Sequence, residues 1–345
     1  MIALKPLVAA IAVYCAYLPV AHSQTLPAEA VTVTVDNFTR AETDRYFSLT
    51  AKRGGFGTFS HWRDLIPVDR PTVIRPNRDT LYSTAVFDMK AGPVSVTLPD
   101  AGGRFMSLVM IDEDHQVLGV HYGAGEYRLN PADVDTRYVM FGVRTLINPA
   151  DPQDLQKIAA LQDAIVAKQE NGPGQFQVPN WDETSRAQIR QTLFALGATL
   201  PDSRGMFGKH GEVDPVRHLI GSAMAWGGNP EKDAYYQVVT PPHNDGKTAY
   251  QLKVADVPKG AFWSVSVYDA QGQFRKNPQG AYALNNLNAQ KAEDGSVSVR
   301  FGDCKPGVAN CLPIMPGWNY MVRFYQPAKA VLDGTWKLPE AQPAS

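Results

Sequence analysis

The sequence predicts a mainly β protein with a helical connector, α+β overall, built as two antiparallel β-sandwich or jelly-roll-like lobes. Residues 72–141 and the chain after residue 236 contain short runs rich in β-branched and aromatic residues, separated by Pro, Gly, Asn and Asp. Residues 151–236 between them have helical apolar spacing. The mature chain of about 320 residues exceeds what one core usually holds. We therefore expect two β lobes, residues 31–150 and 237–340, joined by the connector.

The first 23 residues have the features of a secretory signal peptide. Lys5 supplies a positive start, the apolar stretch 7–20 follows, and the small residues Ala21 and Ser23 stand where a signal peptidase reads. This stretch of about 14 residues is shorter than the roughly 20 that a membrane-spanning helix needs. We expect cleavage after Ser23 and a periplasmic or secreted protein without stable membrane insertion.

The charge balance argues against nucleic acid as a partner. The chain has 33 basic and 34 acidic side chains. Cleavage removes one basic residue, Lys5, and no acidic one, so the net charge changes from −1 by one unit to −2. A nearly neutral chain without basic runs offers no footprint for phosphate binding.

Two cysteines remain after cleavage, Cys304 and Cys311. An oxidising compartment favours a disulfide between them, and Pro306 and Gly307 allow the chain to turn there. Zinc is the rival interpretation, but two cysteines without a nearby histidine or second pair make a poor zinc site. We expect a disulfide.

Three helices are expected. Thr39 to Glu42 has the form of a capping box and predicts a helix of about 12 residues before Gly54. In the connector, 154–168 and 183–200 have helical periodicity.

Strands are expected in both lobes, because their runs alternate or are rich in β-branched residues. The N-terminal runs are 80–87, 94–98, 105–111 and 138–143. The C-terminal runs are 250–254, 262–268, 296–301 and 320–325.

Several motifs carry a resemblance to two known domains. The run Val73-Ile-Arg-Pro-Asn-Arg-Asp-Thr-Leu-Tyr-Ser83 resembles the signature of the domain of unknown function 1254, as do 38–44 and 54–57. Four later segments resemble the domain of unknown function 1214, namely 262–269, 310–313, 322–327 and 334–336. The resemblance covers most of the mature chain. It implies a two-lobed, β-sandwich-rich and often exported protein of a family without one established activity. The pattern usually has Trp where Cys311 stands.

The sequence contains none of the common catalytic or nucleotide motifs, such as Gly-x-Ser-x-Gly, Gly-x-Gly-x-x-Gly, a Walker loop or His-Glu-x-x-His. We therefore expect no cofactor. Asp112, His115 and His121 are weak candidates for metal ligands. The competing interpretation is a solvated acidic turn followed by a half-buried histidine.

Other candidates are aromatic or titratable. His218 would act as a general base if a carboxylate or hydroxyl met it, although such a histidine more often satisfies a helix end or a core hydrogen bond. Trp263 and Tyr268, with Tyr235 and Tyr236, are suited to lining a sugar or aromatic cleft, but aromatic residues in strands are core residues by default.

The densest polar cluster enters the first strand of the N-terminal lobe and contains Arg75, Asn77, Arg78, Asp79 and Tyr82. In an extended chain, Arg75, Asn77 and Asp79 share one face, and Arg78 and Tyr82 do not belong to it. One interpretation is scaffold, with Asn77 and Asp79 holding a turn and Arg75 neutralising Asp79. The other is a ligand site in the main cleft, in which an arginine orients an anion or carbonyl group.

We expect an exported envelope protein that binds a small molecule or glycan in a cleft. Two alternatives stay open, a metal-independent hydrolase of an envelope or imported substrate and a structural or assembly factor without a small ligand. A pocket that joins a carboxylate, a histidine and a nucleophilic hydroxyl would favour the hydrolase. The sequence leaves the ligand, the pathway, catalysis and a homo-oligomeric state undecided.

Overall fold

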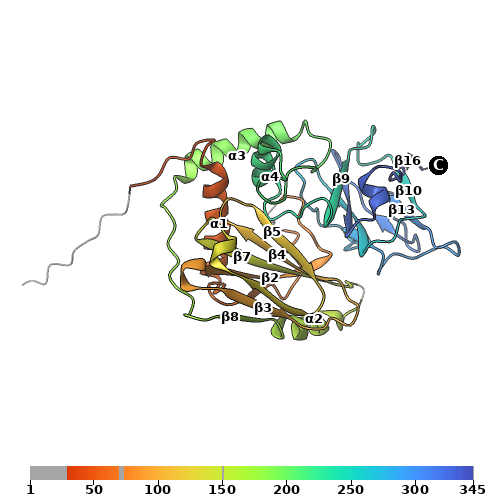
Figure 1. Ribbon diagram of the computed structural model, residues 1–345. Helices are drawn as coiled ribbons and strands as arrows, with labels where there is room; N and C mark the ends of the chain where they lie inside the picture. Colours follow the sequence, from red (N-terminus) through yellow and green to blue (C-terminus); the bar gives the residue numbers. More distant parts are fainter. Residues whose placement is uncertain (1–28, 70–73, 150, 345) are drawn as a thin grey trace, which may run out of the picture.

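The computed structural model describes residues 29–69, 74–149 and 151–344, and the expected signal peptide lies outside these ranges. Two β lobes lie side by side, with the C-terminal lobe in blue (Figure 1). Helices gather on one side of the N-terminal lobe and pack on one another there (Figure 1).

The N-terminal lobe is a sandwich of two antiparallel sheets. The larger has the order β1 (Ser60–His61), β2 (Thr80–Asp88), β7 (Tyr138–Leu146), β4 (Met106–Asp112) and β5 (Val117–Tyr122). The smaller has the order β6 (Gly125–Leu129), β3 (Val94–Leu98) and β8 (Val166–Gln169). Phe87, Leu108 and Phe141 lie in the fully buried core between them. Short 3-10 turns at Met89–Ala91 and Pro131–Asp133 connect strands.

Helices complete the cover of the larger sheet on both of its faces, and α2 does so beside the smaller sheet. On one side Ile158 of α2 (Asp154–Asp163) packs on Leu81 and Ile147. On the other, α1 (Phe38–Lys52), α3 (Glu183–Gly197) and α4 (Pro215–Met224) share a core with β4 and β5. The larger sheet is therefore buried on both faces, which explains its nearly continuous apolar runs.

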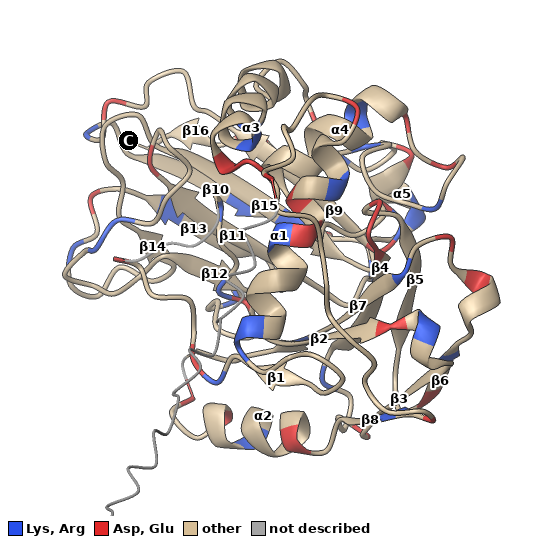
Figure 2. Ribbon diagram, turned by 90° about the vertical axis from the view of Figure 1, so that its left-hand side faces the viewer, with Lys and Arg blue, Asp and Glu red and all other residues tan. Residues whose placement is uncertain are grey.

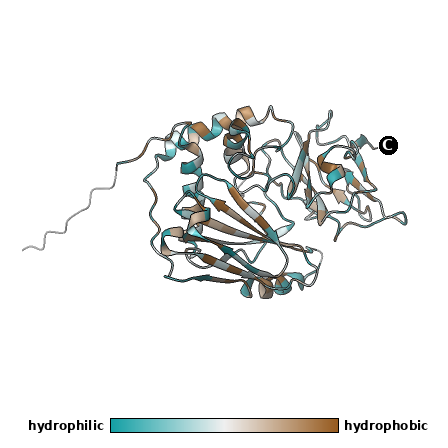
Figure 3. Ribbon diagram, in the orientation of Figure 1, coloured by the Kyte–Doolittle hydropathy of each residue, from teal (hydrophilic) through white to brown (hydrophobic). Residues whose placement is uncertain are grey.

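Helix α1 is mostly hydrophilic and carries charges of both signs, although one side of it is buried (Figures 2 and 3). Glu42 is fully buried, accepts a hydrogen bond from Arg186 and forms a 3.2 Å ion pair with Arg190. The predicted capping box is therefore wrong: the N-cap is Asn37, which makes no side-chain capping bond. Glu42 thus supplies a counter-charge to Arg186, which is buried and pairs with Glu183 as well.

The C-terminal lobe is a second sandwich. One sheet has the order β12 (Ala283–Asn285), β11 (Phe262–Tyr268), β15 (Asn319–Tyr325) and β9 (Ala234–Val239). The other has the order β14 (Cys311–Leu312), β13 (Val297–Phe301), β10 (Tyr250–Val254) and β16 (Gln342–Pro343). Val265, Phe301 and Tyr320 are buried between them. A short helix, α5 (Lys329–Leu332), follows β15.

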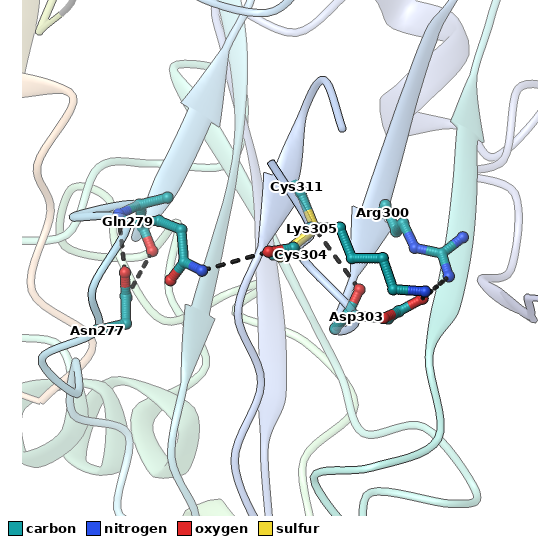
Figure 4. The surroundings of a disulfide bond; sticks show 9 residues. Asn277, Gln279, Arg300, Asp303, Cys304, Lys305 and Cys311 are labelled. Carbon is teal, nitrogen blue, oxygen red and sulfur yellow. Dashed lines mark hydrogen bonds and ion pairs between the residues drawn. A yellow bond between two sulfur atoms is a disulfide. The ribbon is translucent and has the colours of Figure 1, made fainter. Parts of the chain in front are cut away.

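The expected disulfide is present and closes the turn between β13 and β14 (Figure 4). The carbonyl of Cys304 accepts a 3.3 Å hydrogen bond from Gln279. Beside it, Arg300 and Lys305 both pair with Asp303, at 3.0 and 3.4 Å. Strand β14 has only two residues, and the disulfide holds it against the edge of the sheet.

The expected fold class is confirmed, and no sheet among the described strands closes into a barrel. Strands β3, β10 and β11 begin and end at the predicted residues. Two elements in the connector range differ from the expectation. The helix predicted to reach Lys168 ends at Asp163, because β8 follows and pairs with β3. Strand β9 begins within the same range and pairs with β15.

Candidate functional site

Two polar rows of side chains meet where the lobes contact each other. Directly paired residues in neighbouring strands point to the same face of a sheet. In the N-terminal sheet such a row consists of Tyr82, Arg144, Ser107 and Tyr122. In the C-terminal sheet it consists of Asn285, Ser264, Arg323 and Tyr236.

Apolar side chains close one end of this junction. Phe105 lies with its ring centre 5.0 Å from that of Phe262 and 5.4 Å from that of Tyr325. Leu146 and Ala234 complete this buried cluster. The lobes therefore share a small hydrophobic core in addition to the polar rows.

Asn77 connects Tyr82 of the N-terminal row with Tyr325 of the C-terminal lobe. Its Nδ2 lies 2.9 Å from the hydroxyl of Tyr325 and 3.2 Å from that of Tyr82. Its Oδ1 accepts from the backbone N–H of Asp79 at 2.8 Å. The bond to Asp79 forms the turn that we expected of a scaffold residue. The two bonds to the tyrosine hydroxyls place the amide at the junction.

Asp79 is buried at the junction, and burial raises the pKa of its carboxyl. Asn285 donates to its Oδ1 at 3.3 Å, whereas its Oδ2 has no hydrogen-bond partner among the described residues. The cation whose charge opposes the raised pKa is Arg323. The expectation that Arg75 neutralises Asp79 is therefore wrong.

The side chains of Arg75 and Arg78 do not pair with Asp79. Arg75 has a left-handed backbone, with φ of 48°, and its carbonyl accepts from Arg323 at 3.0 Å. Arg78 donates to the carbonyl of Ile66, and its guanidinium lies 5.3 Å from the Tyr282 ring centre. The alternation expected for an extended chain fails because β2 begins only at Thr80.

The aromatic candidates lie on two faces of the sheet that contains β11 and β9. One face points to the junction, and the other points to the C-terminal core. Tyr268 is buried at the junction, where its hydroxyl donates to the carbonyl of Pro76 at 2.8 Å and accepts from Arg323 at 2.6 Å. Trp263 lies on the opposite face, in the C-terminal core, and borders a hollow of about 320 Å³. Tyr235 also packs against that core, whereas Tyr236 belongs to the junction.

A cleft of about 860 Å³ opens beside the junction and is lined by both lobes. Phe105 and Tyr122 contribute aromatic surface, and Asn286 and Gln326 contribute amides from the C-terminal lobe. None of Arg75, Asn77, Arg78, Asp79 and Tyr82 lines it. The cleft and the polar cluster from Arg75 to Tyr82 are therefore different features, although Tyr122 of the N-terminal row lines the cleft.

The charges in the cleft are largely paired with one another. Lys157 Nζ lies 2.9 Å from Asp151, and Arg104 donates to both carboxylate oxygens of Asp154. Asp100 lines the same cleft and accepts from the backbone N–H of Gly102 at 2.9 Å. The cleft thus offers more acceptor oxygens than free cations.

Comparison with protein families assigns both lobes. The family described as "Protein of unknown function (DUF1254)" matches residues 56–169, and the family described as "Protein of unknown function (DUF1214)" matches residues 240–329. The chain is a two-domain DUF1254–DUF1214 protein. The N-terminal polar row lies in the first domain, and Arg323 of the facing row lies in the second.

Solved structures share the fold of this DUF1254–DUF1214 protein. The VPA0106 protein from Vibrio parahaemolyticus has 18% identity and a TM-score of 0.68, over 90% of this chain and 98% of its own. An uncharacterized protein from Burkholderia cenocepacia has 14% identity and a TM-score of 0.51, over 86% and 84%. A comparison with curated proteins finds no match. At these identities the likeness concerns the fold.

His115 and Ser222 lie 2.9 Å apart, but their hydrogen bonds run against a nucleophilic role. The backbone N–H of Gly227 donates to Nε2 of His115, which assigns the ring proton to Nδ1. His115 thus donates to Ser222, whose hydroxyl donates in turn to the carbonyl of His218. A general base would have to accept the proton from the serine.

His218 lies between carbonyl oxygens. Its Nδ1 is 2.8 Å from the carbonyl of Met206, and its Nε2 is 3.0 Å from that of Asp114. Its ring lies 5.4 Å from that of His115. This arrangement ties α4 to the β4–β5 turn.

The three weak metal candidates do not come together. Asp112 accepts from the backbone N–H groups of Asp114 and Gln116, at 3.0 and 2.8 Å. His115 is buried beneath α4, and the ring centre of His121 lies 4.7 Å from that of Tyr127, with the two rings tilted. Within the described ranges, no three His, Cys, Asp or Glu side chains are placed to share a metal ion.

Sequence reasoning missed Arg144, Arg323 and Tyr325. A signal was present, because each arginine interrupts an apolar strand run at an inward position.

No helix in the described part of the chain is long and apolar enough to cross a membrane.

Proposed function

We propose that this DUF1254–DUF1214 protein is an exported binding protein that holds a small molecule or glycan in the cleft between its lobes. The observation that carries the proposal is the cleft itself, which both lobes line. Its volume of about 860 Å³ lies within the range of about 300 to 1,000 Å³ typical of small-molecule sites. The disulfide is compatible with a periplasmic or secreted location.

The chemistry of the lining favours a neutral, hydroxyl-rich ligand over an anion. Both cations are already paired with carboxylates, and Asp100 adds a further acid. Carboxylate and amide oxygens accept from hydroxyl groups, and the rings of Phe105 and Tyr122 offer apolar surface. Asn286 Oδ1 is buried without a partner among the described residues and supplies one more acceptor.

A thermal-shift screen of the mature protein with neutral mono- and oligosaccharides tests the proposal. A ligand at 100 times its dissociation constant stabilises a protein by about 2.7 kcal/mol. We expect Gln326→Ala and Asn286→Ala to weaken binding of the saccharide found. Gln251→Ala is the matched control, because Gln251 lies on β10 and does not line the cleft.

Two outcomes would overturn the proposal. One is that no saccharide gives a saturable shift, in which case the structural or assembly role becomes the better explanation. The other is equal affinity in all three variants, which would place the ligand elsewhere. Binding accompanied by conversion of the saccharide, followed by mass spectrometry, would replace the binding protein with the hydrolase.

A further inference from the structure

Arg144 is a buried cation without a carboxylate partner. It is 8% exposed on β7 and donates to Asn229 Oδ1 at 2.7 Å and to the carbonyl of Gly227 at 2.5 Å. None of the ion pairs among the described residues includes it. Arg186, equally buried, has both Glu42 and Glu183. A guanidinium held away from water without a counter-charge is costly, which indicates that an anion completes this site.

Three tyrosine hydroxyls surround this cation. Tyr82 stands opposite Arg144 on β2, with its ring centre 5.8 Å from the guanidinium carbon. Tyr325, from the other lobe, shares the amide of Asn77 with Tyr82, and the ring centre of Tyr236 lies 6.4 Å from that of Tyr325. The anion site would therefore be built from both lobes.

These hydroxyls accept hydrogen bonds from the protein but donate none to its described residues. Asn77 Nδ2 faces the hydroxyls of Tyr82 and Tyr325, and the backbone N–H of Asn229 faces that of Tyr236. Among the described residues, none of the three hydroxyls donates a hydrogen bond of its own. Burial raises the pKa of Tyr236 and of Tyr325, so both keep their protons at neutral pH.

Asn229 supplies a further donor. Its side chain is 1% exposed, its Oδ1 is used by Arg144, and its Nδ2 has no partner among the described residues. An amide nitrogen buried without an acceptor costs about 1 to 3 kcal/mol. A ligand oxygen beside Arg144 would satisfy it.

The acids of the junction are engaged elsewhere. Asp79 accepts from Asn285, and its charge acts on Arg323. Asp233 accepts from the hydroxyl of Tyr122 at 2.9 Å. Tyr82 and Tyr236 are only half-buried, although Arg144 and Tyr325 are buried.

We propose that Arg144, Asn229 and the hydroxyls of Tyr82, Tyr236 and Tyr325 form a binding site for a small oxyanion. The guanidinium supplies the charge, and the hydroxyls and the amide supply hydrogen bonds to the oxygen atoms. The oxyanion is either the carboxylate of an organic acid or an inorganic ion such as phosphate. None of these five residues lines the cleft, so this site is independent of the proposed saccharide site.

The test uses the mature protein with acetate, succinate and phosphate. Thermal shift and calorimetry are measured against sodium chloride at equal ionic strength, because general screening then cancels. We expect saturable stabilisation by at least one of the three ions. Response to the carboxylates alone identifies an organic acid, and response to phosphate alone identifies an inorganic oxyanion.

Conservative variants locate the site. Tyr82→Phe and Tyr236→Phe remove only a hydroxyl, and each is expected to weaken anion binding about tenfold, the equivalent of one hydrogen bond to a charged group. Tyr235→Phe is the matched control, because it is adjacent on β9 but faces the C-terminal core. It should leave the affinity unchanged.

The proposal is overturned if none of the three ions stabilises the protein beyond sodium chloride. It is also overturned if Tyr235→Phe and Tyr236→Phe bind the ion equally well. Failure of this site leaves the saccharide site untouched, since saccharide binding is measured without the three ions and through different residues.

Discussion

Asn77 and Tyr325 are 248 positions apart in the sequence, yet the amide of Asn77 donates a 2.9 Å hydrogen bond to the hydroxyl of Tyr325. The same amide reaches Tyr82, and its oxygen holds the backbone of Asp79. One side chain thus connects the start of β2 with the C-terminal lobe.

We predict that Asn77→Ala lowers the free energy of unfolding by about 1 to 3 kcal/mol, because it leaves several polar groups without a partner. Urea denaturation measures the loss. Asn37→Ala is the control, since Asn37 holds only an exposed turn near the N-terminus of α1. Equal stability of the two variants would contradict a central role for Asn77 at the junction.

The aromatic contact between Phe105 and Phe262 should couple the stability of the lobes. Phe105→Ala is expected to cost about 3 to 5 kcal/mol, because it opens a hole in the shared core. In a double-mutant cycle with Phe262→Ala, we expect a coupling of about 0.5 to 1.5 kcal/mol. Strictly additive losses would show that the two rings do not interact across the junction.

The protein should lose stability as the pH rises towards neutrality. Burial raises the pKa of Asp44 to about 7, while a hydrogen bond from Trp181 opposes this shift. The folded protein therefore keeps a proton between about pH 4 and pH 7 that the unfolded chain has released. Stability falls through that window by at most about 1.4 kcal/mol per pH unit.

Asp44→Asn tests this origin, because asparagine still accepts from Trp181 and, like the protonated acid, carries no charge beside Glu113. We expect the variant to keep its stability at pH 5 and to show a flatter decline up to pH 8. Asp135→Asn, at an exposed position, should retain the wild-type slope. An unchanged slope in Asp44→Asn would assign the pH dependence to other groups, such as Asp112, whose pKa burial raises to about 6.

Export should yield a mature protein that begins near Gln24 and contains one disulfide. Intact-mass analysis of periplasmic protein under non-reducing conditions measures both features. Retention of residues 1–23, or two thiols open to alkylation, would contradict the prediction. We further expect the double variant Cys304→Ser/Cys311→Ser to lose about 2 to 3 kcal/mol of stability, because the unfolded chain regains freedom.

The connector region is expected to hold the lobes together rather than to let them swing freely. Its helices have apolar faces that need cover, and Leu193 and Ile220 are buried against the N-terminal sheet. Limited proteolysis should therefore be slow across residues 183–224. Rapid cutting there, with both lobes surviving as separate fragments, would argue against this packing.

Local patterns in the sequence were sufficient for the two lobes, for the disulfide and for several central strands, but not for β5, β6, β8 or β9. The bounds of β3, β10 and β11 follow from alternating or β-branched runs, and the cysteine pair from its spacing and expected compartment. These features depend on neighbours in the sequence, so a single chain reveals them. The polar cluster from Asn77 to Tyr82 was visible in the same way.

Only the tertiary structure decided which partners these polar groups have. Arg323, rather than the nearby Arg75, acts on Asp79, and Glu42 pairs with Arg186 instead of capping its own helix. Tyr82 and Arg144 become neighbours through strand pairing, and Tyr325 joins them through the docking of two lobes. Such contacts depend on register and on packing between distant segments, and sequence periodicity contains no information about either.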